Sequence, residues 1–169
     1  FVFSGDLSNQ GEPESYEHLK FILEEAFAPF GVPILLGIGN HDTRETEETD
    51  DRAQVMDNFY LRERLAGEEA AGRASVGPGL FYRFRVASDV EFVCVDTSKE
   101  HFFRRGRLFE YPKHEEFLRR AFPPAAEGGI PWRIPFGHHP PFCAGPQHGN
   151  TDGMEPLVRL FEEGGVRAC

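Results

Sequence analysis

The sequence predicts an α/β fold built around a mixed β-sheet. Short apolar runs typical of buried strands alternate with stretches whose apolar residues recur at helical spacing, and polar residues cluster directly after the predicted strands. The chain has 169 residues, of which 40% are hydrophobic, so it can bury the core of one domain. Phe occurs 17 times, which predicts a core rich in aromatic side chains.

The first third of the chain predicts a strand–helix–strand unit. An apolar strand over 1–4 is followed by a helix over 13–29, in which Pro13 occupies a first-turn position where proline is tolerated. Gly31 ends this helix, and the continuous apolar run 32–38 predicts a strand that is covered on both faces. Such a unit places both strands parallel, with their polar ends at one edge of the sheet. The helix prediction rests on the recurring residues Tyr16, Leu19, Leu23, Ala26, Phe27 and Phe30.

The middle of the chain predicts a helix, a loop and a hairpin. The helix lies near 51–65, and the Gly- and Ala-rich stretch 66–79 is predicted to be a loop. Apolar residues alternate with arginines before Ser88-Asp89, and an apolar run follows, so 80–96 is predicted to be an antiparallel hairpin.

The last third predicts two helices and a strand. The helices lie over 113–122 and near 154–163, and the strand over 132–136 runs into the polar residues 137–139. The closing residues 166–169 have the composition of another strand start.

Composition excludes several classes of protein. The net charge of −10 leaves no basic stripe to neutralise phosphates, so no nucleic-acid partner is expected. No apolar run is long enough to cross a bilayer. The three cysteines are odd in number and lack metal-type spacing, which argues against a disulfide framework.

Three predicted strands end in polar residues: Gly5-Asp6, the run 39–42 and the run 137–140. Ligands of α/β sheets gather at the carboxyl ends of strands, so these three ends are expected to converge. They offer a carboxylate, an amide oxygen and an imidazole, a mixture that suits an ion such as Mn, Fe or Zn. Each end alone is typical of an ordinary turn or cap; the three together, in this order, predict a metal site.

The motifs "GDLSNQG", "GNHD" and "GHHPP" resemble the ordered blocks of the calcineurin-like metallophosphoesterase superfamily. Within it, "GHHPPFCAG" is most similar to acid phosphatases of the purple type. The resemblance implies a mixed-sheet α/β/β/α sandwich, incomplete at both ends, with residues 1–169 as the central portion of one catalytic domain.

The resemblance also implies roles for five residues. Asp6 resembles the carboxylate that bridges two metals, and Asn40 and His138 resemble ligands of the second metal. His41 resembles the histidine that faces the substrate phosphate, and Asp42 is expected to orient the loop or the imidazole. The implied cofactors are two divalent or trivalent ions (Fe, Mn or Zn). The implied reaction is hydrolysis of a phosphate ester by a metal-bound hydroxide, with a phosphomonoester as the leading substrate class.

The other histidines receive weaker assignments. His148 lies in a Gly-rich loop and is a second candidate for contact with the substrate, because purple acid phosphatases place histidines in a similar loop. His139 occupies a position that varies in the motif. We interpret His18, His101 and His114 as ordinary surface residues.

Two departures from the family pattern affect these expectations. Asn9 stands where purple acid phosphatases have a tyrosine ligand, so a purple iron centre is not expected. Asn9 and Gln10 also replace the Asp and Arg of phosphoprotein phosphatases. The family's first block, D-x-H, should precede Phe1, and its last, G-H-x-H, should follow Cys169. We therefore expect this sequence to be the middle of a longer protein, and the 169 residues alone to be inactive.

Two other functions stay open at this point. One is a non-catalytic descendant that keeps the fold as a structural or binding subunit. The other is a phosphodiesterase or nucleotide hydrolase of the same superfamily, which a panel of substrates would distinguish from a phosphomonoesterase.

Overall fold

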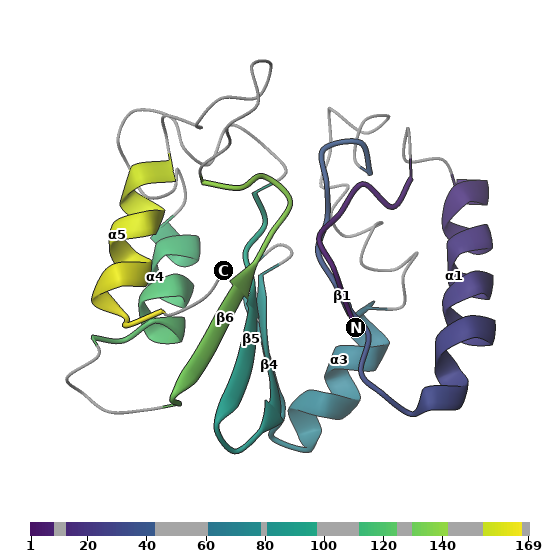
Figure 1. The fold of residues 1–169 in the computed structure, drawn as a ribbon, viewed down its shortest axis with the longest axis horizontal. Coiled ribbons are helices and arrows are strands. Elements are labelled where there is room, and N and C mark those ends of the chain that lie inside the picture. The colour runs from purple at the N-terminus through teal and green to yellow at the C-terminus, as the bar shows by residue number, and fades with distance from the viewer. Residues whose placement is uncertain are drawn as a thin grey trace.

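The computed structural model describes residues 1–8, 13–42, 61–78, 81–97, 112–124, 130–141 and 154–166. Figure 1 shows how the helices and strands are arranged. The elements, in chain order, are β1 (Val2–Phe3), α1 (Pro13–Phe27), the 3-10 helix η1 (Ala28–Phe30), β2 (Leu35–Leu36), α3 (Leu61–Ala70), β3 (Ala74–Val76), β4 (Tyr82–Ala87), β5 (Val90–Cys94), α4 (Pro112–Ala121), β6 (Trp132–Phe136) and α5 (Glu155–Glu163).

The strands form two separate ladders. In the first, β1 and β2 are parallel, with Val2 opposite Leu35, and α1 makes the crossover between them. The second ladder has the order β3-β4-β5-β6, in which β5 and β6 are parallel and the other pairs are antiparallel. The predicted parallel unit, the predicted hairpin and the mixed α/β class are confirmed.

The two ladders lie between helices. Figure 1 shows α4 and α5 on one side of the β4–β6 sheet and α1 on the far side of β1, which gives a helix–sheet–sheet–helix order. One core lies between the larger sheet and α4 and α5, and contains Phe81, Val93, Val95, Phe117, Leu118, Ala121, Phe122, Met154, Leu157, Leu160 and Phe161. The other core lies on the opposite face of that sheet, and contains Tyr16, Leu23, Leu35, Leu36, Ile38, Leu65, Tyr82, Phe84 and Cys94. The expected aromatic character of the core is present in both.

Tyr82 connects the two ladders. The N–H groups of Leu35 and Gly37 donate to β1 carbonyls, so the N–H and C=O of Leu36 point the other way. The fully buried Tyr82 hydroxyl accepts a hydrogen bond from Leu36 N (2.8 Å) and donates one to Leu36 O (2.9 Å). A side chain of the larger sheet thus satisfies backbone groups that a neighbouring strand would otherwise satisfy.

The structure corrects two of the predicted elements. The stretch 66–79 is not simply a loop, because α3 continues to Ala70 and β3 pairs with β4 over Ala74–Val76. β2 is shorter than the predicted 32–38, since its ladder covers only Leu35–Leu36. The predicted helical residues 51–60 lie outside the described residues.

His114 was predicted to be a surface residue, and this prediction is wrong. Only 8% of His114 is exposed, and its ring packs edge-on against Phe81 with the ring centroids 5.0 Å apart. His18 is exposed, as predicted, and His101 lies outside the described residues. Among the described helices, none has the length and apolar character required to cross a bilayer.

Candidate metal centre

The ends of β1 and β2 meet through two glycines. A Cβ on Gly5 would lie 2.4 Å from the backbone N of Gly39, and a Cβ on Gly39 would lie 2.1 Å from Oδ1 of Asp6. Gly5 and Asp6 both have positive φ, 110° and 54° respectively. This conformation is uncommon for a residue other than glycine, although Asp tolerates it better than most. The contact of the two backbones places the Asp6 carboxylate directly beside residues 39–41.

The side chains of Asp6, Asn40 and His138 converge. His138 Nε2 lies 3.0 Å from Asn40 Oδ1 and 3.3 Å from Asp6 Oδ2. Asp6 and Asn40 follow the strands of the smaller ladder, and His138 follows β6 of the larger one. The three predicted metal ligands therefore lie at one point between the two sheets.

Burial affects the charge of His138. It lowers the pKa of the His138 imidazole, while the nearby Asp6 carboxylate acts in the opposite direction and His139 adds to the lowering. The net effect is a pKa below the usual value of histidine, which favours the neutral form of the ring. Neutral imidazole is the form that binds a metal ion.

Asp42 holds the loops of the site together. Only 1% of Asp42 is exposed, and its carboxylate accepts hydrogen bonds from Ser8 N (2.7 Å) and Gly39 N (2.8 Å). The Tyr16 hydroxyl of α1 donates to the backbone carbonyl of Asp42. Burial raises the pKa of the Asp42 carboxyl, and the two backbone hydrogen bonds oppose that rise. These contacts support the expectation that Asp42 orients the loop.

His41 lies beside Asp6 and lines a pocket. Its backbone N–H donates to Asp6 Oδ1 over 3.0 Å. His41, Asp6 and Ser8 line a pocket of about 520 Å³ whose other wall is formed by α1, including Ser15 and His18. His18, which the sequence predicts to be an ordinary surface residue, lines this pocket. His148, the other candidate for substrate contact, lies outside the described residues.

Thr97 and His139 complete the turn that carries His138. The backbone N–H of His139 donates to Thr97 Oγ1 (2.8 Å), and His139 Nδ1 lies 2.5 Å from Thr97 O. The sequence analysis did not single out Thr97, although it directly follows the predicted hairpin 80–96, just as the other site residues follow predicted strands.

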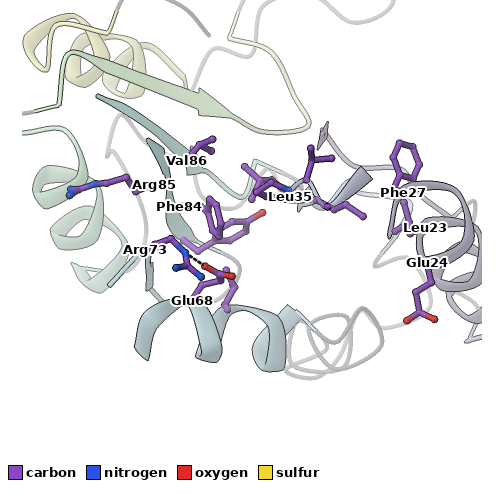
Figure 2. Close-up of a pocket in the computed structure, with 15 residues that line it drawn as sticks. Leu23, Glu24, Phe27, Leu35, Glu68, Arg73, Phe84, Arg85 and Val86 are labelled. Atoms are coloured by element: carbon purple, nitrogen blue, oxygen red, sulfur yellow. Dashed lines mark hydrogen bonds and ion pairs between the residues drawn. The ribbon is translucent and has the colours of Figure 1, made fainter. Parts of the chain in front are cut away.

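A larger pocket lies away from this centre. It has a volume of about 610 Å³ and is lined largely by apolar residues of α1, α3 and β4 and of the segment that leads into β2. Figure 2 shows Glu68 and Arg73 paired beside it, and their Oε2 and Nε atoms are 2.5 Å apart. Of the predicted site residues that the structure describes, Asp6, Asn40, His41, Asp42 and His138, none lines this pocket.

The donor atoms around His138 fit a metal ion. Atoms that each lie about 2.1 Å from one ion are separated from one another by roughly 3.0–3.4 Å. The two distances from His138 Nε2, 3.0 Å and 3.3 Å, fall in this range. The described residues contain no cluster of three or more His, Cys, Asp and Glu side chains, and the third donor here is the Asn40 amide oxygen.

Comparison with known proteins identifies the family. Residues 1–169 match the model of the calcineurin-like phosphoesterases, and the chain belongs to that family. It is 42% identical over 64 residues to a probable cyclic nucleotide phosphodiesterase of Rhodococcus erythropolis; the matched region covers 35% of this chain and 21% of the relative. It is also 42% identical over 43 residues to a cAMP/cGMP dual specificity phosphodiesterase of Mycobacterium tuberculosis, which covers 25% of this chain and 14% of the relative.

These relatives change part of the interpretation of the sequence. The metallophosphoesterase resemblance is confirmed, and calcineurin-like phosphoesterases generally use divalent metal ions. The similarity to purple acid phosphatases is not supported, because both relatives are named as cyclic nucleotide phosphodiesterases. That name matches the phosphodiesterase alternative. The chain spans only about a fifth (21%) of the length of the first relative.

Proposed function

We propose that this chain carries the metal site of a metal-dependent phosphodiesterase whose substrates are cyclic nucleotides. The observation that carries the proposal is the convergence of Asp6, Asn40 and His138 on one point. The substrate class is supported by the names of the two relatives. Phosphomonoester hydrolysis, the leading expectation from "GHHPPFCAG", has no such support.

Asp6, Asn40 and His138 would hold a divalent ion between the two sheets. A bound ion polarises the phosphoryl group and lowers the pKa of water, so that a nucleophile forms near neutral pH. Asn40 supplies an oxygen without charge, which keeps the site electrophilic. The second ion that the family resemblance implies, sharing Asp6, stays a prediction.

His41 would act on the substrate. Its backbone is fixed by Asp6 Oδ1, and its side chain lines the pocket that opens beside the donor set. From there the imidazole would donate a hydrogen bond to a phosphoryl oxygen or a proton to the leaving alkoxide. Asp42 would keep the loop in place without contacting the substrate, because its carboxylate is buried and hydrogen-bonded to backbone.

The test is a substrate panel with three proteins. The wild type and the His41→Ala and Asp6→Ala variants, each expressed from the complete gene, are assayed with Mn²⁺, Zn²⁺ or Fe²⁺. The substrates are 3′,5′-cyclic AMP, bis(p-nitrophenyl) phosphate and p-nitrophenyl phosphate. We expect diester hydrolysis by the wild type, a turnover about 10²–10⁴-fold lower with metal retained in His41→Ala, and loss of metal in Asp6→Ala.

Two results would contradict the proposal. Hydrolysis of the monoester alone would restore the phosphomonoesterase interpretation. Normal metal content without hydrolysis of any of the three would favour a binding protein that keeps the fold.

A further inference from the structure

Thr97 lies near the end of β6 in the larger sheet, beside the turn that carries His138. It lies three residues after the end of β5 (Val90–Cys94), which runs parallel to β6 with Cys94 opposite Phe136. The ladder continues to the end of both strands, since Val95 N donates to Phe136 O over 2.9 Å. Only 4% of Thr97 is exposed. The turn that carries His138 therefore begins against Val95 and Thr97.

Two hydrogen bonds join Thr97 to the residue after His138. The hydroxyl Oγ1 accepts from His139 N over 2.8 Å, and the backbone carbonyl lies 2.5 Å from His139 Nδ1. Because a carbonyl oxygen can only accept, Nδ1 carries the hydrogen and donates it. Thr97 thus holds both the backbone and the ring of His139.

On one side, the turn packs closely against the residues that follow β5. A Cβ on Gly137 would lie 2.6 Å from Val95 O and 3.1 Å from Thr97 Oγ1, so the backbone lies directly on the end of β5. The His139 ring, once held, packs edge-on against the His138 ring with the centroids 4.6 Å apart. This ring contact with His139 restricts the orientation of the His138 imidazole.

We propose that Thr97 is a positioning residue: it clamps the Gly137-His138-His139 turn and so aims the His138 imidazole at Asn40 and Asp6. This inference rests on the proposed metal centre. Groups that orient a metal ligand typically change metal affinity by about 10–100-fold when they are removed. The two hydrogen bonds of Thr97 go to His139, so its effect on the metal would pass through the turn that carries His138.

The experiment removes the hydroxyl and then restores it. Thr97→Val and Thr97→Ala lack Oγ1, whereas Thr97→Ser keeps it and is the matched control. Two quantities are measured for each protein: the affinity for Mn²⁺ by calorimetry, and the hydrogen-exchange rate of the His139 amide in the absence of metal. Circular dichroism verifies the fold, and the Ala variant serves if the Val variant does not fold.

We expect the two hydroxyl-free variants to bind Mn²⁺ about 10–100-fold more weakly and to exchange the His139 amide faster. Thr97→Ser should match the wild type in both measurements. Wild-type values in Thr97→Val, or an equal loss in Thr97→Ser, would overturn the proposal. If the wild type binds no Mn²⁺, Zn²⁺ or Fe²⁺, the proposed metal centre fails, and the exchange rates alone then decide whether Thr97 holds the turn.

Discussion

Gly39 sets the distance between the Asp6 carboxylate and the end of β2. Any side chain at Gly39 would meet Oδ1 and the backbone N of Asp6, at 2.1 Å and 2.3 Å from a Cβ. We expect Gly39→Ala to lower the free energy of unfolding by about 1–3 kcal/mol, the usual cost of overpacking, and to abolish metal uptake because Asp6 must move. Urea unfolding and metal analysis would measure both effects.

Gly67 supplies the matched control for that substitution. It lies inside α3, and a Cβ there would meet no atom within 4 Å. Gly67→Ala should therefore stabilise the protein by about 0.5–1 kcal/mol, because alanine loses less conformational freedom in a helix. Equal behaviour of the two variants would contradict the steric role of Gly39.

At the level of single residues, the order of strands and motifs in the sequence was enough to predict that Asp6, Asn40 and His138 lie close together. The burial of His114 was also readable: it lies three, four and seven residues before Phe117, Leu118 and Ala121, the helical spacing of one buried face. The hydrogen bonds from Ser8 N to Asp42 and from His139 N to Thr97 could not be predicted, since they join residues 34 and 42 positions apart in the chain.

Among the elements, β4 contributes a hydroxyl that acts as a strand partner for β2. Tyr82→Phe would leave the N–H and C=O of Leu36 without the bonds that Tyr82 makes to them in a fully buried place. We expect the free energy of unfolding to fall by about 1–3 kcal/mol, with an unchanged dependence on urea concentration. A change below about 0.5 kcal/mol would show that the hydroxyl contributes no net stability.

Cys94 on β5 gives the fold a dependence on alkaline pH. Burial raises the pKa of its thiol well above the ordinary value, and the nearby Asp96 adds to the rise. In the unfolded chain the thiol ionises near pH 8.5. Its contribution to stability is therefore complete below about pH 8.5, and it is lost as the pH rises toward the folded pKa.

We expect the wild type to lose stability relative to Cys94→Ala by up to about 1.4 kcal/mol per pH unit between about pH 9 and 10. Urea unfolding of both proteins at a series of pH values would measure the difference. Cys143 and Cys169 are present in both and cancel. Parallel curves would mean that Cys94 ionises in the folded protein as readily as in the unfolded chain.

The elements that the sequence predicted least well are those whose structure depends on a partner strand more than on a local sequence pattern. The residues of β3 lie in a Gly- and Ala-rich run without strand alternation, and they are extended because they pair with β4. Only two residues of the predicted strand 32–38 pair with β1, so β2 is short. The hairpin, α4 and β6 were predicted closely, since their local patterns agree with their surroundings.

For the whole molecule, the metal donors belong to two ladders that share no strand among the described residues. An ion held by Asp6, Asn40 and His138 would bind the folded protein alone and stabilise it by mass action, by about 2.7 kcal/mol at a hundred times the dissociation constant. We expect EDTA to lower the melting temperature and added Mn²⁺ to restore it. Asp6→Asn, which keeps a residue tolerant of positive φ, should melt at one temperature in both conditions.

Because its donors come from both ladders, a bound ion would also connect the two sheets mechanically. The ion would cross-link the two ladders, much as a disulfide cross-links two segments of a chain. This cross-link would form only when the donors of both ladders are in place. Coupling of this kind is reciprocal: whatever draws the sheets apart weakens ion binding, and by the same free energy the ion resists their separation. Whether the ion stays bound would therefore show whether the two sheets keep their native arrangement.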